Sequence, residues 1–275
     1  MKTYEIKLIL VLALGVILLF SCGHTNNANQ SGTLITSNPA DGQSDPKMEA
    51  DTTNVHDHVI LNKLLRKYVS AEGIVDYKGF INDSLEFNKY LNLLALNPPK
   101  KKWTDDQVKA YWINAYNAYT VQLIIRGYPV KSIKDLGGSV YKVNTPWDQK
   151  FIHIGDEVYD LNNIEHGILR KDFEEPRVHF AVNCASVSCP RLRNEAYLAE
   201  KLDSQLDDQA RLFINYKPKN NITAEKAELS KIFSWFRGDF KKTGTVIDFI
   251  NKYSDVQISD ATEITYLDYD WNLNE

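Results

Sequence analysis

The chain lacks the glycine-rich and basic patterns that mark most nucleotide-binding and nucleic-acid-binding proteins. Its 275 residues contain no glycine-rich phosphate loop, no dinucleotide-binding fingerprint and no serine nucleophile elbow with flanking glycines. The formal net charge is −4, and lysine and arginine are interspersed with acidic residues. Because no basic stripe is present to neutralise phosphates, we expect no nucleic-acid partner.

Cysteine is also scarce, since only Cys22, Cys184 and Cys189 occur. No spacing of cysteine and histidine along the chain repeats a known structural or catalytic zinc pattern. We therefore expect no metal and no cofactor. Cys184 and Cys189 lie five residues apart, and both fall within the segment RVHFAVNCASVSCP at 177–190.

The N-terminus has the pattern of an export signal. Lys2 and Lys7 precede an apolar run at 8–20, which is shorter than the about 20 apolar residues needed to span a bilayer. The sequence LFSC at 19–22 resembles a bacterial lipoprotein cleavage box, which implies a lipidated Cys22 and a membrane anchor. The alternative is an ordinary cleaved signal peptide. We expect a protein anchored to a membrane of the bacterial cell envelope.

The rest of the chain divides into a tether and one folded domain. Residues 23–54 contain no aromatic residue and are rich in small polar residues, so they predict a disordered tether. Residues 55–275 contain aromatic residues throughout and no internal repeat, which predicts a single domain with its own core.

Periodicity in this domain predicts more helices than strands. Helices are expected at 56–69, 85–96, 104–126, 161–170, 195–215, 231–240 and 245–253; a hairpin at 147–160; and strands at 177–182, 222–229 and 263–269. The elements do not alternate regularly, which indicates an α+β fold. The helix at 104–126 is apolar nearly all round, so we expect it to be buried and packed on a mainly antiparallel sheet.

A thiol at the end of a strand can act as a nucleophile if a base reaches it, and Cys184 has this position. Alternation along 177–182 places His179 on the side opposite Cys184, so His166 is the better candidate base. Glu165 is a candidate to orient the histidine. Asn114 and Asn117 share one face of the buried helix, where their amides could line a pocket or polarise a carbonyl oxygen.

Each of these residues also has a structural interpretation. Cys184 and Cys189 could pair as a disulfide in an oxidising compartment. His179 could be satisfied by hydrogen bonds, and Asn114 and Asn117 could be core amides that hold loops to the helix. Part of the fifteen tyrosines and five tryptophans could form a surface that stacks on a glycan or peptide.

Four motifs taken together, WINAYNAYTV, LNNIEHGILR, HFAVNCASVSCP and YDWNLN, resemble the family known as domain of unknown function 547. The resemblance implies a domain without an assigned activity, related to papain-like or transglutaminase-like thiol hydrolases. Family members with serine in place of Cys189 argue against an obligatory disulfide. The positions that match the family motifs are Asn114, Tyr116, Asn117, Glu165, His166, His179, Cys184, Ser186 and Pro190.

Two functional hypotheses follow. In the first, Cys184 attacks amide bonds of envelope peptide or peptidoglycan, assisted by His166, Glu165, His179 and Asn117. Asn114, Tyr116 and Ser186 then contact the substrate. In the second, the chain is a non-enzymatic binding or scaffold domain with a Cys184–Cys189 disulfide.

Overall fold

The long helix α4 (Asp105–Gly127) is enclosed on nearly all sides. The computed structural model describes residues 57–137, 145–242 and 244–275, all within one contact unit, Thr52–Glu275. From Ala110 to Ile124 every residue of α4 except Gln122 is buried. Thr104 and Gln107 form the predicted capping box at its start. A helix that is apolar all round has no side that is stable in contact with water, so other segments of the protein have to cover it.

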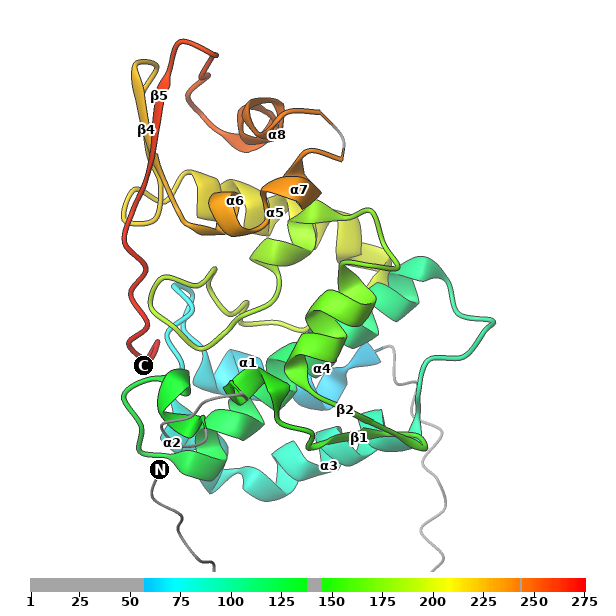
Figure 1. Cartoon of the computed structure of the whole chain (residues 1–275). Helices are drawn as coiled ribbons and strands as arrows, with labels where there is room; N and C mark the ends of the chain where they lie inside the picture. The colour runs from blue at the N-terminus through cyan, green and yellow to red at the C-terminus, as the bar shows by residue number, and fades with distance from the viewer. Residues whose placement is uncertain (1–56, 138–144, 243) are drawn as a thin grey trace, which may run out of the picture. The chain divides into compact units, whose positions relative to one another are not determined.

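Helical segments from both sides of α4 in the sequence provide most of this cover (Figure 1). They are α2 (Tyr77–Asn82), α3 (Ser84–Leu96), the 3-10 helices η2 (Ile133–Leu136) and η6 (Ala199–Lys201), and the π-helix η4 (Asn163–Leu169). Helix α1 (Val59–Tyr68) packs on α2 and α3. Together these elements enclose the first hydrophobic cluster.

The predicted hairpin is confirmed. Strands β1 (Ile152–Ile154) and β2 (Glu157–Tyr159) pair antiparallel across Gly155, which has a φ of 59° that glycine adopts readily. The hairpin packs on α3, and the Tyr159 ring lies 5.2 Å from that of Trp112 on α4.

A second hydrophobic cluster fills the C-terminal part of the unit. Its elements are α5 (Leu202–Ile214), β3 (Asn221–Ile222), β4 (Lys226–Leu229), α6 (Ile232–Trp235), α7 (Arg237–Phe240), α8 (Val246–Tyr253) and β5 (Glu263–Tyr266). The sheet has the order β3-β4-β5, antiparallel between β3 and β4 and parallel between β4 and β5. The chain therefore has the predicted α+β fold, with small sheets and a predominance of helix.

The expected strand at 177–182 is wrong, because this segment forms the 3-10 helix η5 (Pro176–Phe180). Pro176 occupies the first turn, where its fixed φ suits a helix and its missing N–H costs nothing. The Glu175 side chain accepts the N–H of Arg177 at 3.1 Å and caps the turn. The helix joins the two clusters, since Val178 packs in the first and Phe180 in the second.

The expected helix at 195–215 begins later than predicted, with η6 and then α5. The preceding chain is instead held by the Asn114 side chain, which donates to the Tyr197 carbonyl at 2.8 Å and accepts the Tyr197 N–H at 3.0 Å. Asn117 acts in the same way on the loop after η5, donating to the Ala181 carbonyl and accepting the Asn183 N–H, each at 2.9 Å. These contacts support the structural interpretation of both amides.

The signal, Cys22 and the tether predicted at 1–54 lie outside the described residues. Within the described ranges, no helix has both the length and the hydropathy needed to cross a bilayer.

We predict that Asn117→Ala lowers the free energy of unfolding by about 3 kcal/mol, because it leaves a buried carbonyl and a buried N–H without partners. Urea unfolding followed by circular dichroism measures the change. Asn92→Ala, on an exposed position of α3, is the control and should change stability by less than about 0.5 kcal/mol. Equal effects of the two substitutions would contradict the proposed role of Asn117.

Candidate functional site

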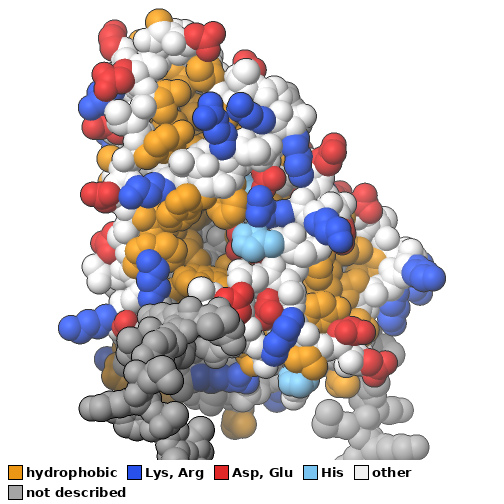
Figure 2. All heavy atoms as spheres, in the orientation of Figure 1, with side chains coloured by type: hydrophobic (Ala, Val, Ile, Leu, Met, Phe, Trp, Pro, Cys, Tyr) orange, Lys and Arg blue, Asp and Glu red, His pale blue; other side chains and the backbone are white. Residues whose placement is uncertain are grey.

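A cavity of about 200 Å³ lies where elements of the two clusters meet. Figure 2 shows a hollow on this face with hydrophobic side chains around much of its edge and a histidine beside it. Seven of the residues singled out from the sequence line the cavity: Tyr116, Glu165, His166, His179, Cys184, Cys189 and Pro190. They come from α4, η4, η5 and the loop after η5, so the fold brings together segments that are far apart in the sequence.

The helical conformation of η5 explains why His179 and Cys184 share this cavity. In a strand, residues 179 and 184 would point to opposite faces. Helix η5 ends at Phe180, its C-cap Ala181 still has helical dihedral angles, and both His179 and Val182 line the cavity. Cys184 follows two residues later. Because the expected strand is absent, His179 and Cys184 do not lie on opposite faces as the sequence predicted.

His179 is held in one orientation, and its burial favours the neutral ring. The residue is 2% exposed, its ring stacks on Phe236 at a centroid distance of 3.9 Å, and its Nε2 lies 2.9 Å from Asp239 Oδ2. A carboxylate only accepts hydrogen bonds, so Nε2 carries the proton. Burial lowers the pKa of His179, although the hydrogen bond to Asp239 opposes this shift. Among the described residues none bonds to Nδ1, whose lone pair is left available.

Asp239 on α7 is the residue that sequence reasoning missed. Its carboxylate accepts hydrogen bonds from His179 and, at 2.6 Å, from Arg170 Nε. These two donors hold the pKa of Asp239 well below its usual range. An ionised carboxylate here orients the imidazole and stabilises any imidazolium that forms. No sequence motif indicates this role for Asp239, because the surrounding tetrapeptide RGDF at 237–240 has no feature that marks a functional site.

His166 and Glu165 lie in the same cavity but face different partners. The exposed His166 ring accepts through Nδ1 from Arg170 Nη1 at 2.9 Å. Glu165 is 9% exposed and lies against Tyr116. Burial raises the pKa of Tyr116 well above its usual value, and the charge of Glu165 raises it further. Glu165 therefore interacts with the Tyr116 hydroxyl. In the described part of the chain, no side-chain hydrogen bond joins Glu165 to His166.

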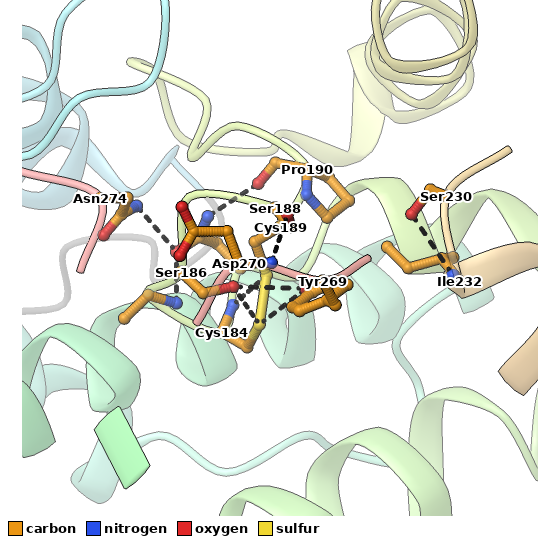
Figure 3. The surroundings of a disulfide bond; sticks show 12 residues. Cys184, Ser186, Ser188, Cys189, Pro190, Ser230, Ile232, Tyr269, Asp270 and Asn274 are labelled. Carbon is orange, nitrogen blue, oxygen red and sulfur yellow. Dashed lines mark hydrogen bonds between the residues drawn. A yellow bond between two sulfur atoms is a disulfide. The ribbon is translucent and has the colours of Figure 1, made fainter. Parts of the chain in front are cut away.

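Cys184 and Cys189 form a disulfide, with their Cα atoms 6.1 Å apart (Figure 3). The Cys184 sulfur also lies 3.4 Å from both the Ser186 hydroxyl and the Tyr269 hydroxyl. Burial raises the pKa of Tyr269, so its hydroxyl stays protonated and can donate. Ser186 is buried beside the sulfur but does not line this cavity.

The loop that carries the disulfide is braced by Asn183. The Asn183 side chain accepts the Ala185 N–H at 2.9 Å and donates to the Pro190 carbonyl at 2.7 Å. The first bond supports Ala185 in a left-handed conformation with φ of 59°, which is uncommon for alanine. Asn114 and Asn117 do not line the cavity, and the amide of Asn117 is fully engaged with the backbone.

Four aromatic side chains form one wall of the cavity: Trp147, Trp235, Tyr269 and Trp271. The Tyr269 ring centroid lies 4.8 Å from that of Trp235 and 4.5 Å from that of Trp271, and Trp147 is 5.7 Å from Trp271. Trp235 is 48% exposed, although it is large and apolar. Such a wall offers flat apolar faces to a ligand.

The residues that the structure describes include no group of three or more histidine, cysteine, aspartate or glutamate side chains placed to hold a metal ion.

Comparison with known proteins connects part of this site to a family. Residues 100–214 match the family model described as "Protein of unknown function, DUF547", which confirms the predicted resemblance over this span. The span contains α4, η4, η5 and the disulfide loop, whereas Asp239 and three aromatic residues of the cavity wall lie beyond it. No curated protein and no solved structure matched the chain.

We predict that the NMR titration of His179 has a midpoint below its ordinary pKa of 6.5, because burial disfavours the charged ring. Asp239→Asn should lower the midpoint further, since it removes the charge that favours imidazolium. In the unaltered protein, the pKa of His179 is 6.5 in the unfolded chain and lower in the folded chain. Between these two pKa values the unfolded chain therefore binds more protons than the folded chain. His179 therefore lowers stability as pH falls from 6.5 through its folded pKa. A midpoint above 6.5, or a rise of the midpoint in Asp239→Asn, would contradict this assignment.

Proposed function

We propose that the chain is a lipid-anchored envelope protein that hydrolyses amide bonds, or transfers their acyl groups, in this cavity. The reaction requires that the Cys184–Cys189 disulfide is first reduced. One observation carries the proposal: a buried His179, whose ring is oriented by Asp239 and whose Nδ1 has no hydrogen-bond partner among the described residues, lines the same cavity as Cys184. A nucleophile and a base that is itself oriented by a carboxylate are the parts needed for covalent acyl transfer.

The reaction follows from these groups. A dithiol reductant reduces the Cys184–Cys189 disulfide by thiol–disulfide exchange. The protein then has two thiols, and the reductant has become a disulfide. His179 Nδ1 accepts the Cys184 proton, and the thiolate attacks the amide carbonyl. The carbon–nitrogen bond then breaks, and the imidazolium returns the proton to the leaving amine. Water or an amine acceptor releases the acyl group from Cys184.

His179 suits the role of base better than His166, which the sequence favoured. Its ring is fixed by the Phe236 stack and the Asp239 hydrogen bond, whereas His166 is exposed and its Nδ1 is occupied by Arg170. Fixed orientation lowers the cost of reaching the reactive geometry.

The oxyanion is better stabilised by Tyr269 than by Asn117. Both polar groups of the Asn117 amide are bonded to the backbone, and the Ala185 N–H is bonded to Asn183. The Tyr269 hydroxyl lies 3.4 Å from the Cys184 sulfur. A donor at that distance from the attacking atom can reach the oxygen that becomes charged.

A second candidate function is a binding domain for envelope peptide or glycan. The closed disulfide and the aromatic wall favour it, because a stapled loop beside flat apolar rings can hold a ligand without chemistry. The two functions differ in whether reduction creates a reactive thiol.

We predict that the reduced chain is alkylated by iodoacetamide faster at Cys184 than at Cys189. His179→Ala should slow alkylation of Cys184 at pH 7 by about tenfold or more, because loss of the base raises the thiol pKa by about one unit or more. Mass spectrometry of tryptic peptides over time gives both rates. His153→Ala, at an exposed position on β1, is the control and should leave both rates unchanged.

Equal alkylation of the two cysteines, or an unchanged Cys184 rate in His179→Ala, would rule out an activated thiol and leave the binding domain. His166→Ala separates the two histidines: a slowing confined to that variant would transfer the role of base to His166. Hydrolysis of peptidyl p-nitroanilides by the reduced chain, absent from Cys184→Ser, tests the chemistry itself.

We predict that Cys22→Ser moves the chain from the membrane fraction to the soluble fraction of a bacterial host, because the substitution removes the acceptor for the lipid. Immunoblotting of fractionated cells measures the distribution. Ser21→Ala keeps a small residue before the cysteine and should remain in the membrane fraction. A Cys22→Ser chain that stays membrane-bound would contradict lipid anchoring at this position.

A further inference from the structure

A second cavity, of about 300 Å³, lies beside the disulfide loop. Pro190 lines both this cavity and the first, so the two are separated at that point by the loop itself. The lining combines two cations, Arg191 and Lys219, with apolar and aromatic side chains from the end of α5 and the turn that follows it: Leu212, Phe213 and Tyr216. Nothing in the proposed chemistry uses these groups.

Among the described residues, no carboxylate balances the charge of Lys219. Its ammonium donates to the Cys189 carbonyl and lies 5.9 Å from the ring centroids of both Phe213 and Tyr216. In the described ranges, no acidic oxygen lies within ion-pair distance of it. Burial alone lowers the pKa of Lys219 to about 8, and no neighbouring charge offsets the shift. The ammonium is thus mostly charged at neutral pH and has only a neutral oxygen as its bonded partner.

Arg191 places a second cation in a fixed position. Its Nη1 donates to the Ala71 carbonyl at 2.8 Å and its Nε to Gln209 Oε1 at 3.0 Å. Its Nη2 lies 3.7 Å from Asp208, a loose pair that leaves much of the guanidinium charge acting on the cavity. Glu72 is at the exposed rim, where its hydrogen bond from Ser70 lowers its pKa.

We infer that this cavity binds a small organic carboxylate with an apolar body. The carboxylate accepts a hydrogen bond from the Lys219 ammonium, and the charge of Arg191 adds to the attraction. The apolar part packs against Leu212, Phe213 and Tyr216. The lining fits a monoanion better than a dianion, because two of the donor nitrogens of Arg191 are already used within the protein and Asp208 and Glu72 lie close by.

Phenylacetate is the probe and phenylacetamide, which has nearly the same shape without the charge, is its control. The full chain, labelled with ¹⁵N and kept oxidised at pH 7, is titrated with each while amide resonances are followed by NMR. We expect saturable shifts with phenylacetate at the amides of Arg191, Gln209 and Lys219, and binding at least tenfold weaker for phenylacetamide. This comparison needs no substitution in the chain.

Two variants locate the site. Lys219→Met should weaken phenylacetate binding at least tenfold, whereas Lys217→Met, which removes an exposed lysine two residues away, should bind as the unaltered chain does. Lys219→Arg retains the charge and should bind within about threefold of the unaltered chain.

Several outcomes would overturn the inference. They are an absence of saturable shifts, equal binding of phenylacetate and phenylacetamide, equal loss of binding in the two lysine-to-methionine variants, and tighter binding of phenyl phosphate than of phenylacetate. The last would identify a phosphate site in place of a carboxylate site. Because all titrations use the oxidised chain, failure of this inference is distinct from failure of the proposed thiol chemistry.

Discussion

The structure depends on the enclosure of a helix that has no polar face. Helix α4 has to be covered on all sides, and its two buried asparagines decide which chain segments cover two of those sides. A buried amide left unpaired is costly, so each asparagine takes both a carbonyl and an N–H from a segment that has no regular ladder of its own. The irregular backbone from 181 to 197 is thereby tied to α4 at Ala181, Asn183 and Tyr197.

The position of the cavity between the two hydrophobic clusters determines the burial and orientation of His179. Helix η5 contributes Val178 to one cluster and Phe180 to the other, which leaves His179 between them. Removal from water disfavours the charged imidazole, while the Asp239–Arg170 pair keeps a hydrogen-bond acceptor beside it. Burial and orientation of the histidine therefore have one origin, the packing of the linking helix.

Local patterns in the sequence predicted much of this fold, and non-local packing decided the rest. The capping box at Thr104 and the turn at Gly155 act over three or four residues, so they could be recognised without the fold. The segment 177–182 alternates like a strand, yet Pro176 and the packing of Val178 and Phe180 in separate clusters make it helical. Asp239 could not be found, because its partner His179 is sixty residues away and no local motif links the two.

The bracing of the disulfide loop has a consequence for what reduction can do. Asn183 fastens Pro190, Lys219 fastens the Cys189 carbonyl, and the Ser188 hydroxyl accepts the Asp270 N–H at 2.8 Å. The six-residue segment from Cys184 to Cys189 and its two flanks are thus also held by polar contacts that do not involve sulfur. None of these contacts depends on the S–S bond, so reduction would change the reactivity of the two sulfur atoms without removing any of them.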